Sequence, residues 1–417
     1  MKNPLARIAA AGAGYKAKVL ASAVFVSGRE PEAVLAEDTR LDAYLILRLF
    51  SADVDREARS AEARFLGAFM PRTALVRPGL GAALAWGDPP AVSGPASLER
   101  PAPPKEDFAA LSAPALEPIV ADAFTEPNPA RLRRTRAIVI LKDGKLAAER
   151  YAAPFTSATP LAGWSMTKSV LGALVGAAVE RGLMRLEDRD LLPEWSQDAR
   201  RDISVADLLR MRSGLAFGEV YADPLSDVVQ MLFAEPDAAA FAAARPLAHP
   251  PGTVWKYSSG TTNILSAVLR RALARQGVDY HSFAREALFS PLGMSSAVLE
   301  TDAAGTFVGS SFMYATARDW ARFGLYAAQD SPWMREARTP TPQSPDGRYG
   351  AHWWLKLSPE LGGDEGLPAD AFHALGHEGQ CLTVVPSREL VVVRLGLSIY
   401  IDAWDHNAFL RRVLAAA

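Results

Sequence analysis

The segment Gly163-Trp164-Ser165-Met166-Thr167-Lys168 carries the pattern on which the fold prediction depends. Among nine lysines, Lys168 alone has a serine three positions before it. Apolar residues recur at helical spacing through residues 165–180, so Ser165 and Lys168 would share one face at a helix N-terminus. A serine needs a base to become a nucleophile. Burial lowers the pKa of a lysine, so that its neutral amine can act as this base. Such a pair also arises by chance, but the unusually apolar helix favours a buried, functional lysine.

Predicted strands precede and follow this helix in the sequence. Residues 137–141 and 146–151 flank Asp143-Gly144, a pair that favours the positive φ angles of a tight hairpin turn. Residues 382–385 and 390–397 form a second predicted hairpin, and a helix over residues 403–415 closes the chain. The predicted helices between the hairpins cover residues 205–211, 225–233, 262–276, 281–288 and 316–328. Because these helices do not alternate with strands, we expect a mostly antiparallel sheet in an α+β arrangement with a helical insertion.

The N-terminal quarter is predicted to be a separate part of the chain. Eight prolines between Asp88 and Pro118 are dense enough to exclude regular structure and to form an extended connector. Before them, residues 30–49 and 57–70 show helical patterns, and the apolar run 19–26 is interpreted as a buried strand or helix, being a poor signal peptide. We therefore expect an N-terminal module of unknown role over residues 1–107 and a main domain over residues 108–417, with a helical lobe inserted at about residues 183–330.

Composition excludes several classes of function. A net charge of −2 gives no field that would attract nucleic acid or an anionic membrane, and no apolar run is long enough to span a bilayer. The single cysteine, Cys381, excludes an intramolecular disulfide, which is compatible with a cytoplasmic protein and leaves the periplasm as the alternative. The six histidines form no metal-binding motif, and the phosphate-binding loop of nucleotide hydrolases is missing. We therefore expect neither a metal nor another cofactor.

Two further segments are candidates for the same site as Ser165. Tyr257-Ser258-Ser259 precedes a predicted helix, and a tyrosine hydroxyl near the lysine would relay a proton to the leaving group. Gly376-His377-Glu378-Gly379-Gln380 enters the second hairpin, where glycines allow close approach of a substrate and a strand N–H can stabilise an oxyanion. A tyrosine at such a position is more often a packing residue, so the three segments carry weight only together.

These segments, in this order, resemble the penicillin-recognising serine hydrolases, which include class C β-lactamases, D-alanyl-D-alanine peptidases, family VIII esterases and 6-aminohexanoate-dimer hydrolases. The resemblance runs from about residue 141 to the C-terminus, and is closest to the 6-aminohexanoate-dimer hydrolase branch. The strings that carry the branch are Trp164 to Ser169, Tyr221-Ala222-Asp223-Pro224-Leu225-Ser226-Asp227-Val228, Tyr314-Ala315-Thr316-Ala317-Arg318-Asp319 and Gly379-Gln380. The resemblance implies a β-lactamase/transpeptidase-like fold, in which an antiparallel sheet is flanked by helices and accompanied by an all-helical lobe.

The resemblance also implies a role for each motif residue. Ser165 would be the acyl-enzyme nucleophile, Lys168 its general base and Tyr257 the proton shuttle, while the backbone N–H groups of Ser165 and Gln380 would form the oxyanion hole. The substrate-binding residues would be Tyr221, Ser259, His377, Glu378 and Gly379. No cofactor is implied, and the partner would be a small amide or ester.

Two departures from the family pattern bear on the substrate. Ser259 replaces the asparagine of the Tyr-x-Asn motif, and His377-Glu378-Gly379 replaces Lys-Thr-Gly, so a fixed cation is lost and a carboxylate is added. A pocket containing that carboxylate should bind an anionic β-lactam poorly; the alternative is that Glu378 points to solvent. We expect a serine hydrolase of amides or esters. A β-lactamase, a D-alanyl-D-alanine carboxypeptidase, and a catalytically silent binder of peptides or cell-wall fragments remain alternatives.

Overall fold

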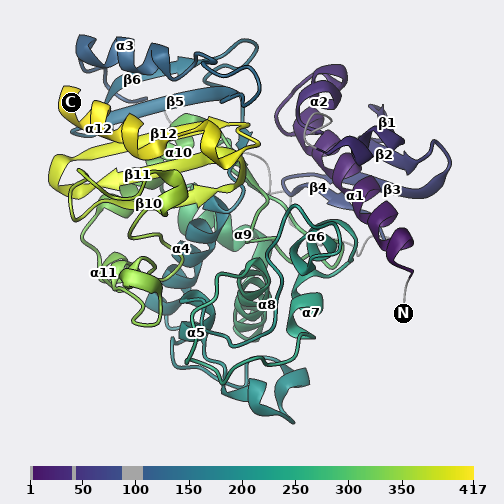
Figure 1. Ribbon diagram of the computed structural model, residues 1–417. Helices are drawn as coiled ribbons and strands as arrows, with labels where there is room; N and C mark the ends of the chain where they lie inside the picture. The colour runs from purple at the N-terminus through teal and green to yellow at the C-terminus, as the bar shows by residue number, and fades with distance from the viewer. Residues whose placement is uncertain (1–2, 40–43, 87–106) are drawn as a thin grey trace. The chain divides into compact units, whose positions relative to one another are not determined.

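The computed structural model describes residues 3–39, 44–86 and 107–417 (Figure 1). The chain forms two compact units. The first unit contains Met1–Glu99, Arg181–Ala284 and Val298–Phe312, and the second contains Arg100–Glu180, Arg285–Ala297 and Met313–Ala417. Most of the predicted connector, residues 87–106, lies outside the described residues. The division at residue 107 into a separate N-terminal module and a main domain stays a prediction.

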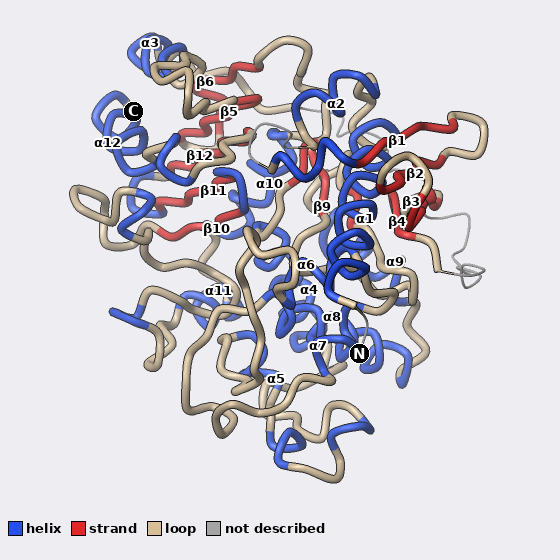
Figure 2. The backbone as a smooth tube through the Cα atoms, turned by 45° about the vertical axis from the view of Figure 1, so that its right-hand side comes forward, coloured by secondary structure: helices blue, strands red, loops and turns tan. Residues whose placement is uncertain are grey.

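The second unit is built on a five-stranded antiparallel sheet with strand order β10-β11-β12-β5-β6, which Figure 2 shows side by side. Its strands are β5 (Thr135–Lys142), β6 (Lys145–Tyr151), β10 (Phe372–Gly376), β11 (Gln380–Val385) and β12 (Leu390–Gly396), with a separate pair β7 (Leu161–Ala162) and β9 (Met313–Ala315). Its helices are α3 (Glu117–Asp122), α4 (Met166–Glu180), α10 (Ala317–Ala328), α11 (Pro332–Arg338) and α12 (His406–Ala416). Both predicted hairpins and the antiparallel α+β arrangement are confirmed.

Local chemistry explains the first hairpin and one error nearby. Asp143 and Gly144 both have positive φ, at 52° and 70°, as the turn between β5 and β6 requires. The prolines up to Pro118 were expected to exclude regular structure, but the short helix α3 (Glu117–Asp122) contains Pro118. Proline is tolerated in the first helical turn because the N–H it lacks has no partner inside the helix there. That part of the prediction is wrong.

Helices cover both faces of this sheet. On one face, α3 and α12 pack over residues such as Ile138, Ile140 and Val392, and on the other face α10 lies against β5, β11 and β12. A side chain at Gly324 of α10 would collide with Val391, so helix and sheet are in close contact. Cys381 belongs to the core between the sheet and helices α3 and α12, and burial raises the pKa of its thiol to about 12. The sheet therefore forms a rigid, helix-covered platform for the β10–β11 turn.

The first unit begins with helix α1 (Pro4–Phe25), which packs on a four-stranded antiparallel sheet in the order β1-β2-β3-β4. The elements of this part are α2 (Pro31–Glu37), β1 (Phe50–Asp55), β2 (Ser60–Phe65), β3 (Phe69–Arg77) and β4 (Gly81–Leu84). Residues 19–26, predicted to be a buried strand or helix, lie at the end of α1 and contribute Leu20 and Val24 to the core. Within the described ranges, no helix has the length and apolar character needed to cross a bilayer.

The helix predicted over residues 57–70 is wrong, because this segment contains strand β2 and the turn that follows it. Ala61 and Ala63 are buried beneath α1. Glu62 and Arg64, which alternate with these alanines, form an ion pair with each other. This alternation has the period of a strand. Alanine, glutamate and arginine have high helix propensity, which hid the alternation, and packing against α1 overrides that propensity. Similarly, the helix predicted over 30–49 is limited to α2 and a 3₁₀ turn at Leu45–Leu49 among the residues described there.

The regular elements described between Arg181 and Ala284 are all helical. The bounds predicted for the helical lobe, about residues 183–330, stay a prediction. The helices include α5 (Val205–Leu209), α6 (Asp227–Phe233), α7 (Ala238–Ala243), α8 (Ser259–Arg275) and α9 (Tyr280–Ala284), and the two-residue strand β8 (Val298–Leu299) belongs to the same unit. Trp195 is fully buried here and its indole N–H donates to the carbonyl of Ala243 at 3.0 Å.

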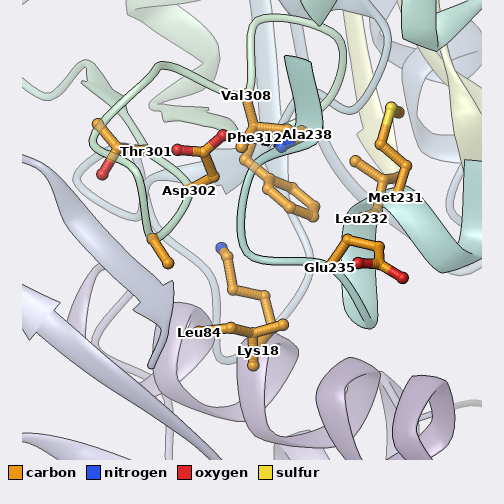
Figure 3. Close-up of a pocket in the computed structure, with 11 residues that line it drawn as sticks. Lys18, Leu84, Met231, Leu232, Glu235, Ala238, Thr301, Asp302, Val308 and Phe312 are labelled. Carbon is orange, nitrogen blue, oxygen red and sulfur yellow. Dashed lines mark hydrogen bonds between the residues drawn. The ribbon is translucent and has the colours of Figure 1, made fainter. Parts of the chain in front are cut away.

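A buried ion pair connects α1 to the segment Val298–Phe312 within this unit. Lys18 of α1 pairs with Glu300, which is fully buried, and its Nζ lies 4.0 Å from the centre of the Phe312 ring. A cavity of about 20 Å³ beside Lys18 is lined by Leu84, Met231 and Asp302 among others (Figure 3). That volume holds about one water molecule, so the cavity has no room for a substrate.

Candidate active site

Ser165 stands at the turn that leads into α4. Trp164, the preceding residue, has a positive φ of 47°, so the chain turns sharply just before the helix begins. Lys168 Nζ lies 2.8 Å from Ser165 Oγ, and the lysine side chain is only 1% exposed. The i, i+3 spacing therefore produces the contact that the sequence predicts. A buried amine in hydrogen-bonding contact with a half-buried hydroxyl is the arrangement needed to take the proton of a serine nucleophile.

His352 lies against the backbone of the Ser165 helix. Its Nδ1 is 3.0 Å from the carbonyl oxygen of Lys168, which can only accept, so Nδ1 carries the proton and donates. The hydroxyl of Ser169 donates to the carbonyl of His352 at 2.6 Å. Burial, and to a lesser extent the nearby Lys168 charge, lowers the pKa of His352 to about 3. His352 is therefore neutral at ordinary pH and holds the first turn of α4 in place.

The β10–β11 turn approaches the Ser165 turn closely. A side chain on Gly376 would lie 2.2 Å from the carbonyl oxygen of Gly163, so only glycine fits there. Gly379 has a φ of 79°, and a side chain there would lie 2.5 Å from Arg394 Nη1. The two glycines of the predicted motif thus allow close contact between backbone segments.

Gln380 is fixed by its side chain. The Gly396 N–H donates to Gln380 Oε1 at 2.9 Å, and Gln380 Nε2 donates to the Gly396 carbonyl at 2.7 Å. These two bonds attach the first residue of β11 to the end of β12. The Gln380 backbone, predicted to supply half of an oxyanion hole, therefore belongs to a rigid part of the sheet.

Glu378 does not point to solvent. Its side chain is 7% exposed, and the indole N–H of Trp164 donates to Glu378 Oε2 at 2.7 Å. Glu378 has a positive φ of 64°, so the two residues joined by this bond both have left-handed backbone conformations. The neighbouring His377 ring lies edge-on to the Trp164 ring at a centroid distance of 5.4 Å. The structure thus joins the first and third predicted segments by side-chain contacts.

Tyr257 and Ser259 belong to the first unit. Tyr257 is half-buried and stands two residues before α8, whose N-cap Ser258 accepts a hydrogen bond from the Thr261 N–H at 3.1 Å. Ser259 is fully buried, and both its N–H and its hydroxyl donate to the carboxylate of Glu219, the former at 2.9 Å. The residue at the third position of the tyrosine motif is therefore held by a carboxylate of its own unit.

Tyr221 lies in the loop that precedes α6. Ser226 ties this loop together, because its hydroxyl donates to the Gly218 carbonyl at 2.9 Å and accepts from the Val220 N–H at 3.1 Å. Tyr221 is half-buried at the tip of this closed loop. Two hydrogen bonds of Ser226 therefore close this loop on itself.

Three contacts of the predicted site residues, each within one unit, were not predicted from sequence. Trp164 precedes the serine in the sequence, but its bond to Glu378 joins residues far apart in the chain, and no local pattern reveals it. Glu219 and His352 have no motif around them. The Gly-Glu pair two residues before Tyr221 is the one available signal for Glu219, since a carboxylate beside a loop tyrosine would be a reasonable candidate.

Two other buried histidines of the second unit, His373 and His406, contact a threonine of the sheet. His373 Nδ1 is 2.9 Å from Thr383 Oγ1, which lies 2.8 Å from His406 Nε2. Burial lowers the pKa of His373 to about 3. No group of three or more histidine, cysteine, aspartate or glutamate side chains in the described ranges is arranged to bind a metal ion.

Comparison with known proteins gives consistent similarities. The family model named Beta-lactamase matches residues 120–396. The 6-aminohexanoate-dimer hydrolase of Paenarthrobacter ureafaciens is 25% identical over 301 residues, covering 63% of this chain and 72% of the relative. A penicillin-binding protein homologue from Caulobacter crescentus has a TM-score of 0.56 at 17% identity, covering 75% of this chain and 100% of its own. A family VIII carboxylesterase has a TM-score of 0.56 at 17% identity, covering 75% of this chain and 98% of its own.

The family match extends from α3 to the end of β12 and includes both the Ser165 helix and the Gln380 strand. The solved structures, at their low identities, support the fold alone, and that fold is the predicted β-lactamase/transpeptidase-like arrangement. The matched segment spans more than half of the chain. This protein therefore belongs to the β-lactamase family, whose members are serine hydrolases.

Proposed function

We propose that this protein hydrolyses a small amide or ester through an acyl-enzyme formed on Ser165. Ser165 Oγ attacks the substrate carbonyl while Lys168 Nζ takes its proton. The C–N or C–O bond to the leaving group then breaks, and the amine or alcohol departs with a proton. Water subsequently attacks the acyl-serine, which releases the acid and restores the hydroxyl. This sequence requires no metal or cofactor.

The observation that carries the proposal is the contact between Lys168 Nζ and Ser165 Oγ at 2.8 Å. Lys168 is 1% exposed, so bulk water does not compete for its amine. Ser165 is at the N-terminus of a 15-residue helix, whose aligned peptide dipoles favour negative charge on the attacking oxygen. A structural serine–lysine pair would not need a strained residue immediately before it, yet Trp164 has a positive φ.

The remaining roles follow from the family motifs. Tyr257 is proposed as the proton shuttle to the leaving group, and Tyr221 as a contact to the substrate. The backbone N–H groups of Ser165 and Gln380 are proposed as the oxyanion hole, where a developing negative charge is stabilised by preorganised donors.

The substrate class is proposed from the two departures from the lactamase pattern. Ser259 is occupied by the Glu219 carboxylate, and His377-Glu378-Gly379 lacks the lysine that would attract an anionic substrate. Both places thus bring a carboxylate where lactamases present an amide or a cation, which disfavours an anionic β-lactam. We therefore propose short neutral or amine-bearing amides and small acyl esters, in agreement with the similarity to a 6-aminohexanoate-dimer hydrolase.

A fluorophosphonate probe tests the nucleophile. Wild-type protein should be labelled on Ser165, and Ser165→Ala should lose both label and turnover. Ser331→Ala is the matched control, because Ser331 also stands at a helix N-terminus but has methionine three positions later. Absence of label from the wild-type protein would favour a silent binder and refute the proposal.

A substrate panel tests the class of reaction. The panel contains p-nitrophenyl acyl esters, a linear 6-aminohexanoate dimer, a D-alanyl dipeptide and nitrocefin. We expect kcat/KM to be higher for the esters or the linear amide than for nitrocefin. A preference for nitrocefin or the D-alanyl dipeptide would support the β-lactamase or carboxypeptidase alternative instead.

A further inference from the structure

Two strained turns of the second unit are joined by one buried hydrogen bond. Trp164 and Glu378 have φ angles of 47° and 64°, and each side chain is 7% exposed. The indole N–H of Trp164 donates to Glu378 Oε2 at 2.7 Å. Bulky and charged residues rarely adopt positive φ unless surrounding contacts hold them there. The bond is such a contact for both residues at once.

Two more contacts join the same turns. The ring of His377 packs edge-on against the Trp164 ring, with an interplanar angle of 85°. Gly376 approaches the carbonyl of Gly163 so closely that a side chain there would lie 2.2 Å from the oxygen. The two turns are therefore in contact through the Gly376 backbone, the His377 ring and the Glu378 carboxylate. These are three consecutive residues at the β10–β11 turn.

The far side of the Glu378 turn is attached to the sheet. Ser398 N donates to the Glu378 carbonyl at 2.9 Å, and the fully buried Arg394 donates to the Gly379 carbonyl at 2.8 Å. The main chain of Glu378 is thus fixed by β12 and the residues after it, while its carboxylate reaches the opposite way to Trp164. Glu378 connects a rigid sheet to the turn that carries the nucleophile.

We infer that Glu378 and Trp164 are positioning residues that set the spacing between the two oxyanion donors. The inference rests on the proposed function, in which these donors are the backbone N–H groups of Ser165 and Gln380. Ser165 directly follows Trp164, and Gln380 follows Glu378 by two residues. Oxyanion donors act only within about 2.7–3.1 Å of the charge they stabilise. Because a misplacement of about 1 Å can reduce the rate about 100-fold, the bond between the two turns bears on kcat.

This assignment gives Glu378 a second task besides disfavouring an anionic substrate. A carboxylate that accepts a buried indole N–H is directed at Trp164, and a neutral acceptor of the same shape would keep the bond. The charge of Glu378 is then dispensable for positioning, whereas its acceptor oxygen is not. Substitutions of the two partners can separate these properties.

The test compares three variants by steady-state kinetics with a p-nitrophenyl ester. Trp164→Phe removes the N–H and keeps an aromatic ring, and should lower kcat on the order of 10- to 100-fold with little change in KM. Glu378→Gln keeps an acceptor oxygen for the indole N–H, so its loss of kcat should be at least about threefold smaller than that of Trp164→Phe. Trp195→Phe is the matched control, because it also removes a buried indole hydrogen bond, in the first unit. It should leave kcat unchanged.

Several results would overturn the inference. These are a Trp164→Phe kcat within about threefold of the Trp195→Phe value, a change confined to KM, or a Glu378→Gln loss as large as that of Trp164→Phe. Thermal melting of each variant identifies loss of folding, and an unfolded Trp164→Phe protein is replaced by Glu378→Ala, for which the same fall in kcat is expected. Fluorophosphonate labelling distinguishes the two levels of failure. A wild-type protein not labelled on Ser165 refutes the proposed function, whereas a labelled wild type with an unaffected Trp164→Phe variant refutes this inference alone.

Discussion

Replacing Lys18 by methionine should strongly destabilise the first unit. Lys18 is 3% exposed and Glu300 is fully buried, so the substitution leaves a carboxylate in the interior without its cation. Ser22 Oγ and the Ala82 N–H would still donate to Glu300, at 3.0 Å and 2.7 Å. Burial raises the pKa of Glu300 and lowers the pKa of Lys18, so burial opposes both charges, while the attraction and hydrogen bond between the two side chains favour them. Removing one partner of such a pair costs about 3–5 kcal/mol.

The assay is urea unfolding of the full-length protein followed by circular dichroism, with the transition of the first unit compared between variants. Lys16→Met is the matched control on the same helix, because Lys16 is also buried but donates to the Phe50 carbonyl. Its loss should cost about 1–2 kcal/mol. The double variant Lys18→Met, Glu300→Gln should recover at least half of the stability, since an amide oxygen can still accept from Ala82.

Acidification gives an independent check on the same variant. Without Lys18, Glu300 takes up a proton in the folded state, whereas the unfolded chain releases this proton above about pH 4.3, the ordinary glutamate pKa. The difference in free energy of unfolding between wild type and Lys18→Met should therefore narrow as pH falls toward that value. The reasoning is refuted if Lys18→Met is no more destabilising than Lys16→Met. It is also refuted if the double variant is as unstable as the single one.

Three other predictions concern the base, a buried acid and the chain connection. Lys168→Ala should lower kcat/KM at least about 100-fold, and Lys168→Arg should not rescue it because guanidinium stays protonated; a variant that keeps about a tenth of the activity contradicts the role. Burial raises the pKa of Asp302 to about 7. The folded state therefore holds a proton that the unfolded chain releases near its lower pKa, and stability should fall as pH rises between those values; equal slopes of unfolding free energy against pH in wild type and Asp302→Asn would disprove this. Protease cleavage between residues 88 and 107 should leave both fragments together in native size-exclusion chromatography, because Lys18 and Glu300 are paired; release of a folded 108–417 fragment would support the separate N-terminal module.

The parts of the fold predicted correctly from sequence are those set by neighbouring residues. Asp143-Gly144 determines its hairpin because two adjacent residues accept positive φ, and Ser165 meets Lys168 because three positions make most of a helical turn. The segment 57–70 was misjudged because its alanines and charges favour a helix locally, and only packing against α1 makes it a strand.

Contacts between distant residues could not be predicted in the same way. Trp164 and Glu378 are separated by 214 positions, and Lys18 and Glu300 by 282. Nothing in the local spacing of either residue indicates its partner. The motif around Glu378 marks the residue as a candidate. The direction of its carboxylate depends on the backbone conformation of the turn, which the sequence does not reveal.

The lone cysteine makes this protein convenient for spectroscopic labelling. Cys381 is 1% exposed and its thiol has a pKa of about 12, so maleimides and other alkylating reagents should not reach or find a thiolate there under native conditions. A pair of cysteines introduced at exposed positions, one in each unit, would then be the reactive thiols of the native chain. Fluorophores or spin labels attached to them would report the distance between the units, without first engineering a cysteine-free background.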